Sequence, residues 1–508
     1  MMLLQLLLTL ACTATAIPTI PEPAQVVEPQ DPLITAPPDP TRTRTYLQQR
    51  DLLSDFEADV GSVLSDLGSV PSYVASGIAN FFQDFPTGDK VQSSLGINDA
   101  QLKALPTQVL NLSPYANWTS NGWNVRFHGN VYKQPNTSTQ DLNKLANKFL
   151  VDVDITSLPP SQQDQARNLT ASIFVVQQPN VTVSPIQIQV GQSGGGGSTS
   201  VMLPFNTTKE GDFDVFMPIV ANGLMPGNST QQIQHLSTHF AGATLGNATA
   251  YLVPDEGITI IMDIDDTLRV TKIYQPKEGL LNSFARPFTA WQNMPAIMAS
   301  WLQSLPNLHF HYLTTTPEQG TRLYMDYIFK TYPAGSFDTR PLNFSNIDET
   351  LAVRKYLLEK IIRTYPKRKF VLIGDTSNAD VMKDYPAMAT QFPGQIQCIF
   401  LRNVTASDSS DHFPYNTKGF KNLNQSNYMF FVNSDDLHGL DIAGGQCYNK
   451  SVAQNLTFDY QGIPGRNTDT AINASATHVA GASRIVGGSI LLQVGFSSLL
   501  ALLFLQLL

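Results

Sequence analysis

The chain has 508 residues, a formal net charge of −9 and 42% hydrophobic residues. This length leaves room for more than one domain with its own core. The negative balance gives no electrostatic reason to bind nucleic acid, whose phosphates attract basic surfaces. We therefore expect a folded multidomain protein with no nucleic-acid partner.

The first hundred residues resemble a leader, a spacer and a helical segment. Residues 1–16 have a long apolar core and a small-residue end, which predicts a cleaved signal peptide although Lys and Arg are absent from its beginning. The proline-rich residues 17–44 predict an extended linker. Apolar spacing over residues 45–85 predicts two amphipathic helices within a helical segment spanning 45–100.

Residues 101–250 are predicted to form a β-rich, sandwich-like domain. Apolar and polar residues alternate in short segments, which is typical of antiparallel strands. A glycine-rich loop separates two of them, and no catalytic constellation occurs among them. The predicted strands lie at residues 123–132, 149–155, 171–178, 183–190, 200–205 and 212–220.

The sequence ITIIMDIDDTLRVT at residues 258–271 is the strongest functional signal, and it opens a predicted catalytic domain at 251–457. A β-branched apolar run predicts a buried parallel strand, and open α/β sheets bind ligands at strand ends. In an extended segment Asp263 and Asp265 would point the same way, and their repulsion predicts a cation such as Mg²⁺ between them. One carboxylate could then attack phosphorus while the other transfers a proton. The alternatives are an acidic surface turn or a structural Ca²⁺ loop.

A second predicted strand at residues 309–317 ends in three threonines. A hydroxyl at this position can bind a transferring phosphoryl oxygen, and we favour Thr314 over Thr315 and Thr316. The alternative is that these threonines cap the helix that begins near Pro317.

The helical segment at residues 353–366 begins with two basic residues, Arg354 and Lys355. A cation is needed to offset charge on a phosphoryl group during transfer. Either residue could supply it, and the pattern does not choose between them.

The sequence RKFVLIGDTSNAD at residues 368–380 predicts a further strand that ends in Gly374 and Asp375, with Asp380 downstream. Gly374 is expected to let the backbone turn sharply, so that the two acids complete an oxygen coordination shell. The order of this loop after the first one makes the pair a stronger signal than either alone.

The end of the chain predicts membrane attachment. A polar stalk at 458–484 leads to an apolar tail at 485–508, with small residues around Asn473. This layout predicts a glycosylphosphatidylinositol (GPI) anchor signal with Asn473 as the attachment site; the alternative is a tail-anchored or single-pass membrane protein.

Fourteen N-x-S/T sequons support passage through the secretory pathway. We expect the protein on the outer face of the plasma membrane or in the cell wall. Cys398 and Cys447 are a candidate disulfide, and free buried thiols are the alternative. The sequons are at Asn111, Asn117, Asn136, Asn168, Asn180, Asn206, Asn228, Asn247, Asn343, Asn403, Asn424, Asn449, Asn455 and Asn473.

The ordered motifs DIDDTLRVT, NSFARPF, HYLTTTP and TYPKRKFVLIGDTSNAD, followed by IFLRNVT, resemble the haloacid dehalogenase superfamily. More narrowly, residues 253–431 resemble the phosphatidate phosphatase catalytic domain of a fungal actin-patch protein and its bacterial relatives. The resemblance implies an α/β Rossmann-like fold with a parallel sheet. It also implies Mg²⁺-dependent conversion of phosphatidate to diacylglycerol through an aspartyl-phosphate, with a phospholipid substrate at a membrane surface.

The resemblance also implies residue roles. Asp263 would be the nucleophile, and Asp265 the general acid/base with a backbone carbonyl on the metal. Thr267 and Thr314 would bind phosphoryl oxygens together with Arg354 or Lys355. The implied metal-binding residues are Asp263, Asp265, Asp375 and Asp380.

Two segments depart from the family pattern. The chain has Thr-Thr-Thr-Pro at 314–317 and Gly-Asp-Thr-Ser at 374–377, where the family usually has Ser-Asn-Ser-Pro and Gly-Asp-Ser-Gly. These changes keep hydroxyls but alter bulk beside the phosphate, which bears on turnover rate and substrate choice. Two alternative functions follow: the same chemistry on another extracellular phosphomonoester, or a non-catalytic cell-surface glycoprotein that only binds a metal or a partner.

Overall fold

A computed structural model describes most of the chain between residues 91 and 461. The predicted signal peptide, linker, helices at 45–85, glycine-rich loop and anchor signal lie outside the described ranges, as does the stalk beyond Gln461. Within those ranges, no helix has both the length and the apolar character needed to cross a membrane. The described ranges are 91–93, 95–150, 153–183, 186–190, 199–219, 223–305, 307–340, 347–408, 415–454 and 457–461.

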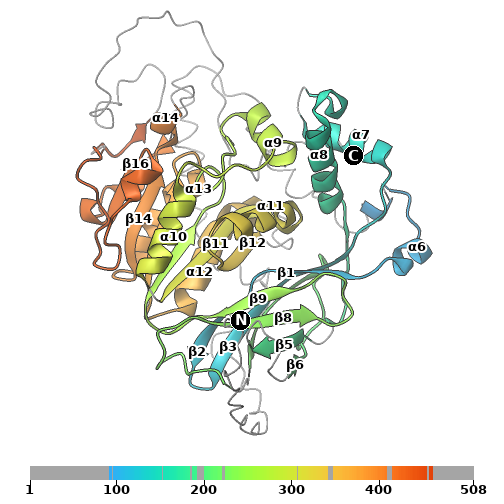
Figure 1. Cartoon of the computed structure of the whole chain (residues 1–508), viewed down its shortest axis with the longest axis horizontal. Helices are drawn as coiled ribbons and strands as arrows, with labels where there is room; N and C mark the ends of the chain where they lie inside the picture. Colours follow the sequence, from blue (N-terminus) through green and yellow to red (C-terminus); the bar gives the residue numbers. More distant parts are fainter. Residues whose placement is uncertain are drawn as a thin grey trace, which may run out of the picture.

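A six-stranded parallel sheet lies at the centre of the C-terminal half of the described residues (Figure 1). Its order is β12-β11-β10-β13-β14-β16, and every neighbouring pair is parallel. The apolar runs predicted these strands because both faces of such a sheet are covered. The strands are β10 (Ile258–Met262), β11 (Leu308–Pro317), β12 (Ser336–Arg340), β13 (Lys369–Asp375), β14 (Ile396–Arg402) and β16 (Tyr428–Phe431).

Helices cover both faces of this sheet, which confirms the predicted α/β layering. Along β10, Ile261 packs into the core shared with α12 and α13, whereas Ile260 and Met262 pack into the core shared with α10 and α11. This alternation is the two-residue period of a strand. The helices are α9 (Pro276–Phe284), α10 (Met294–Ser304), α11 (Glu318–Thr331), α12 (Ile347–Thr364), α13 (Ala379–Gln391) and the short α14 (Val404–Ser407).

The β-rich part hydrogen-bonds as a single branched, mixed sheet of nine strands among the described residues. The path runs β1-β3-β2-β9-β8-β5-β6, with β4 and β7 also paired to the long strand β3, and only the β2–β9 pair is parallel. The strands are β1 (Gln108–Asn111), β2 (Tyr115–Thr119), β3 (Gly122–Lys133), β4 (Val176–Gln177), β5 (Ile186–Val190), β6 (Thr199–Val201), β7 (Asp212–Pro218), β8 (Gln234–Phe240) and β9 (Ala248–Leu252).

One predicted strand in this part was wrong, and another was confirmed only at its end. No described residue of 149–155 lies in a strand, and Phe149 ends helix α7 (Thr139–Phe149). Residues 171–178 begin in helix α8 (Pro160–Ile173), and only Val176–Gln177 form a strand, β4. Ser138 caps α7 by accepting the Asp141 N–H, and a proline starts α8. The apolar residues of α8 recur at helical spacing, so the helical period outweighs the short alternation at its end.

Cys398 and Cys447 form a disulfide. It joins strand β14, which lies next to the edge strand β16, to the segment after the short 3₁₀ helix η4 (Ser434–Leu437). Both residues are buried. A separate two-stranded antiparallel pair, β15 (Tyr415–Asn416) with β17 (Tyr460–Gln461), closes the C-terminal end of the described chain.

Candidate active site

The two acidic loops meet where the strand order of the parallel sheet reverses. From β10 the chain continues to β11 on one side, while β13 lies on the other side of β10. Asp263 directly follows β10 and Asp375 ends β13, and the Asp263 N–H donates to the Ile373 carbonyl over 2.8 Å. In open α/β sheets this switch point is where ligands bind. The structure therefore brings the two predicted motifs to one site.

Asp263 lies buried at the centre of this site. Its Oδ1 accepts the Ile264 N–H at 3.0 Å and lies 3.3 Å from Arg354 Nη2, and its Oδ2 accepts Asn378 Nδ2 at 3.2 Å. Burial raises the pKa of Asp263 to about 6; nearby Asp265 adds to the rise and Arg354 opposes it. The carboxylate is thus held in a defined orientation and is still ionised near neutral pH.

The structure separates the two candidate cations. Arg354 is buried and contacts Asp263, while its Nε and Nη1 make no hydrogen bond to any described residue. Burial alone would lower the Arg354 pKa, but Asp263 and other acidic neighbours outweigh that and raise it. Lys355 instead lies 3.8 Å from Glu359 on the same helix. Arg354 is therefore the cation placed beside the carboxylate.

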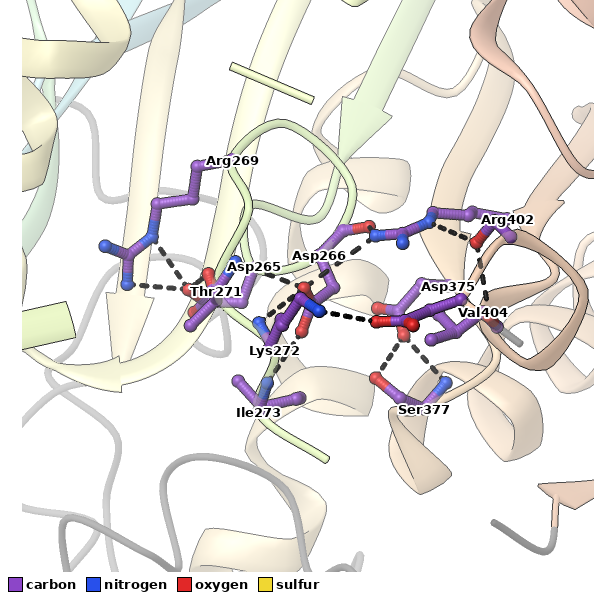
Figure 2. Close-up of polar contacts among 12 residues, drawn as sticks. Asp265, Asp266, Arg269, Thr271, Lys272, Ile273, Asp375, Ser377, Arg402 and Val404 are labelled. Atoms are coloured by element: carbon purple, nitrogen blue, oxygen red, sulfur yellow. Dashed lines mark hydrogen bonds and ion pairs between the residues drawn. The ribbon is translucent and has the colours of Figure 1, made fainter. Parts of the chain in front are cut away.

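The Asp265 carboxylate contacts other residues than Asp263 does (Figure 2). Its Oδ1 accepts Arg269 Nε at 2.9 Å and the Thr271 hydroxyl at 2.8 Å. The chain turns after Met262, since the Leu268 N–H already donates to the Ile264 carbonyl over 2.9 Å. The period-two argument for parallel side chains thus does not apply after β10.

Asp266 is a structural residue of this loop that sequence reasoning did not single out (Figure 2). It has a φ of 54°, and its carboxylate accepts the N–H groups of Thr271, Lys272 and Ile273 at 3.1, 2.7 and 2.9 Å. Arg402 from β14 donates to the Asp266 carbonyl at 2.5 Å. A residue held at positive φ by so many bonds fixes the turn that presents its neighbours.

Asp375 lies at the end of β13, and only one of its two carboxylate oxygens accepts hydrogen bonds from described residues. Its Oδ1 accepts the Ser377 N–H at 2.7 Å and the Ser377 hydroxyl (Figure 2). Its Oδ2 is buried without a hydrogen-bond partner among the described residues. Burial, followed by the charges of Asp263 and Asp266, raises the pKa of Asp375 to about 8.

Gly374 does not make the sharp turn that was expected. It lies within β13, and its φ is not positive. A Cβ at this position would lie 2.8 Å from Val381 Cγ1 and 3.2 Å from Tyr385 Cε2. Glycine is required here because helix α13 packs directly on the strand.

Asn378 is a second residue that sequence reasoning missed. It is the N-cap of α13, where its Oδ1 accepts the N–H groups of Asp380 and Val381 at 3.1 and 3.4 Å, and its Nδ2 donates to Asp263. The cap pattern before an acidic first turn was the available signal. Asp380 lies in that first turn, where burial raises its pKa and Arg354 opposes the rise.

The predicted hydroxyl residues lie at the same end of the sheet. Thr267 is fully buried, and its Oγ1 has no hydrogen-bond partner among the described residues. Thr314 is buried, and its Oγ1 accepts the Thr316 N–H at 3.1 Å. Thr315 is partly buried. Thr267 therefore offers a free buried donor, and Thr314 serves at least to order its own loop.

The donor chemistry of Asp263 and Asp375 fits Mg²⁺, which prefers carboxylate oxygens. Both pKa values are raised, and Asp375 Oδ2 is unpartnered, so a cation would relieve a charge conflict there. No group of three or more His, Cys, Asp or Glu in the described ranges is spaced to hold a metal ion. The full predicted set is thus not assembled: the Asp265 carboxylate is committed to Arg269 and Thr271, and Asp380 lies toward Arg354.

Residues 258–403 match the family model described as "Phosphatidate phosphatase APP1, catalytic domain". This segment is therefore similar to a phosphatase catalytic domain. The match spans the parallel sheet from β10 to β14, including every predicted site residue.

Two curated relatives match parts of the chain. "Phosphatidate phosphatase APP1" of Saccharomyces cerevisiae is 31% identical over 167 residues, covering 32% of this chain and 28% of the relative. An uncharacterized protein of Schizosaccharomyces pombe is 29% identical over 217 residues, covering 40% of this chain and 32% of the relative. The matches thus span less than a third of each relative's length.

Solved structures add no argument about fold or function. A 2,6-sialyltransferase of Photobacterium sp. JT-ISH-224 is 8% identical, with coverage of 49% of this chain and 42% of that chain and a TM-score of 0.17.

Proposed function

We propose that the protein is a Mg²⁺-dependent phosphomonoester hydrolase of haloacid dehalogenase type that acts through an aspartyl-phosphate on Asp263, with phosphatidate as its substrate. The observation that carries the proposal is a buried, oriented carboxylate at the switch point, beside a buried guanidinium with unengaged donors. The family match of residues 258–403 supports the substrate.

The site can perform in-line displacement with its own side chains. An Asp263 oxygen attacks phosphorus, the bond from phosphorus to the leaving alkoxide oxygen breaks, and a proton reaches that oxygen. Arg354 Nη1 and the Thr267 hydroxyl offer donors for the phosphoryl oxygens as charge develops on them. Water then attacks the aspartyl-phosphate, which releases phosphate and restores the carboxylate.

Asp265 is the proposed proton-transfer group. Its Oδ1 forms an ion pair with Arg269 Nη2 over 2.7 Å, which holds the carboxylate in place for removal of a proton from the attacking water in the second step. To protonate the leaving oxygen in the first step, Asp265 must first take up a proton. The Oδ2 atom accepts none of the bonds from Arg269 and Thr271, so it is the oxygen available for that proton.

The proposed Mg²⁺ would bind at Asp263 and Asp375, where it supplies Lewis-acid stabilisation of phosphoryl oxygens. The proposed setting is the secretory pathway, with attachment to the outer membrane face through the C-terminal signal. Most phosphatidate lies in cytosolic leaflets, so another extracellular phosphomonoester is the alternative substrate.

The experiment is Mg²⁺-dependent phosphate release by the full-length protein, from phosphatidate in mixed micelles and from p-nitrophenyl phosphate. Asp263→Asn removes the nucleophile with almost no change in shape and should lower release at least 10³-fold. Asp326→Asn on the exposed face of α11 is the matched control and should keep wild-type release.

The outcomes separate the alternatives. Release from p-nitrophenyl phosphate alone would keep the chemistry and discard phosphatidate. Release that persists in Asp263→Asn would discard the assigned nucleophile. If phosphate is released from neither substrate, a non-catalytic cell-surface protein is favoured.

A further inference from the structure

The β-rich sheet covers the outer edge of the catalytic sheet. Strand β12 is the edge strand on that side. Its Phe337 N–H donates to the Ser113 carbonyl over 3.4 Å, and His128 Nε2 lies 2.9 Å from the Phe337 carbonyl. Backbone groups that an edge strand would expose are therefore satisfied by the segment between β1 and β2 and by β3.

Arg126 of β3 is the buried centre of this contact. Its Nε and Nη2 donate to Asp214 of β7 at 2.8 and 2.9 Å, and its Nη1 donates to both oxygens of Asp338 of β12 at 2.8 Å. All three side chains are nearly inaccessible to solvent. A single guanidinium thus joins a carboxylate of the β-rich sheet to one of the catalytic sheet.

The residue after Asp338 holds the end of β11. The Thr339 hydroxyl donates to the Thr316 carbonyl, and the Thr316 N–H donates to Thr314 Oγ1 at 3.1 Å. The pairing of β11 with β12 shifts register between Leu313 and Pro317, so residues 314–316 form an irregular segment. Such bulges next to active sites re-aim side chains.

We propose that Arg126 is a positioning residue: through Asp338 and Thr339 it orders the 314–316 segment that binds the phosphoryl group. The connection runs Arg126, Asp338, Thr339, Thr316, Thr314, and every link except the peptide bond from Asp338 to Thr339 is a hydrogen bond. The β-rich part thereby contributes to the site without touching substrate. The inference rests on the proposed function for the role of Thr314.

The first test uses Thr339→Val, which removes only the hydroxyl donor, and Thr339→Ser, which keeps it. In the full-length protein, Thr339→Val should raise the inhibition constant of inorganic phosphate about 10-fold, because that factor corresponds to the binding free energy of roughly one lost hydrogen bond. Amide exchange of the peptide containing residues 313–316 should accelerate. Thr339→Ser should match wild type in both.

Thr238→Val is the matched control. Thr238 is equally buried, and its hydroxyl donates to the Ala248 carbonyl in the β-rich sheet, away from β12. It should change the melting temperature without changing phosphate inhibition or exchange at 313–316. Unaltered exchange in Thr339→Val would overturn the proposal, as would equal effects of Thr238→Val.

The second test asks whether Arg126 acts through Thr339. Arg126→Lys keeps the charge but loses the fork that bridges two carboxylates. If both residues belong to one chain of contacts, the double variant Arg126→Lys with Thr339→Val should raise the inhibition constant of phosphate no more than the more damaging single variant does. If the fold-changes of the two single variants multiply in the double variant, Arg126 does not act through Thr339. Should Arg126→Lys not fold, Asp338→Asn replaces it.

The two proposals fail separately. A wild-type protein that releases no phosphate from any phosphomonoester would refute the proposed function. The exchange comparison at 313–316 would still decide the positioning role.

Discussion

At the scale of single residues, the site concentrates negative charge where water is excluded. Asp263, Asp266 and Asp375 are all buried, and each has a raised pKa because burial disfavours the ionised form. Arg354 and Arg402 offset part of this charge. The remaining imbalance is a cost to folding that a bound cation would relieve.

Asn378 combines two roles that a substitution can separate. Asn378→Ser keeps the helix cap, since serine caps as well as asparagine, but removes the amide that donates to Asp263. We expect kcat/KM to fall about 10-fold or more, because a hydrogen bond to a charged group is lost, with the melting temperature within about 2 °C of wild type. The measurement pairs steady-state kinetics with thermal unfolding.

Asn98→Ser, at the cap of α6 (Asp99–Ala104), is the control for this cap exchange and should leave kcat/KM unchanged. Equal activity of Asn378→Ser and wild type would show that the Asn378 amide does not orient Asp263 for the proposed reaction.

The raised pKa of Asp375 predicts that the stability of the protein depends on pH. Its folded-state pKa is about 8, against an unfolded value near 4. Between these values the folded state holds a proton that the unfolded state has released, so the free energy of unfolding falls as pH rises through this window. In chelator-treated protein, Asp375→Asn should therefore melt about 2–4 °C or more above wild type at pH 9, and close to it at pH 4.

Magnesium provides the companion measurement. Binding to the folded state should raise the melting temperature of wild type at pH 8 but not that of Asp375→Asn. An equal shift in both proteins would place the cation elsewhere, and a difference in melting temperature that is independent of pH would contradict the raised pKa.

At the scale of elements, helix α13 carries Asn378 and Asp380 to the site, and its distance from β13 is set by Gly374. A Cβ at residue 374 would come within 2.8 Å of Val381 Cγ1, closer than real contacts allow. Gly374→Ala should displace the helix, lower stability by about 1–3 kcal/mol and lower kcat/KM about 10-fold or more. Unfolding in denaturant and steady-state kinetics measure the two effects.

A second substitution tests the cause. Val381→Ala removes the clashing methyl groups, so the double variant Gly374→Ala with Val381→Ala should regain activity that Gly374→Ala lacks. Failure of this rescue would mean that Val381 is not the contact that requires the glycine, and would leave Tyr385 as the neighbour that does.

Strands with a long apolar run could be predicted from their own residues. Segments whose structure depends on a helix that begins further upstream could not. The strands at β10, β11 and β13 follow from continuous apolar residues that end in polar ones. Residues 149–155 and 171–178 alternate locally, yet both begin in helices whose caps and apolar stripes lie upstream. A short alternating window does not contain that information.

At the scale of the whole molecule, exposure divides the sequons. Asn111 is buried and its amide donates to Thr238 and Gly246, and Asn403 is buried as the cap of α14. A glycan at either position would prevent this packing. The exposed sequon residues in the described ranges are Asn136, Asn168, Asn180, Asn206, Asn228, Asn247 and Asn424.

We predict that protein recovered folded from the secretory pathway carries glycans at several exposed sequons and none at Asn111 and Asn403. Enzymatic deglycosylation in heavy-oxygen water, followed by peptide mass spectrometry, reports the occupancy of each site. A glycan on Asn111 in folded protein would contradict the packing around β1, and absence of glycans everywhere would contradict the secretory setting.

Apolar runs and motif order predicted the parallel strands, the β-rich region and the candidate acidic residues, because these patterns are local properties of the chain. The packing of helix α12 against the sheet was needed to show that Arg354 rather than Lys355 faces Asp263, because adjacent residues of a helix point in different directions. The same holds for Asn378 beside Asp263 and for Arg126 beside Asp338, which lie 115 and 212 residues apart in the chain. Such contacts depend on how the sheets and helices pack, which no local pattern records.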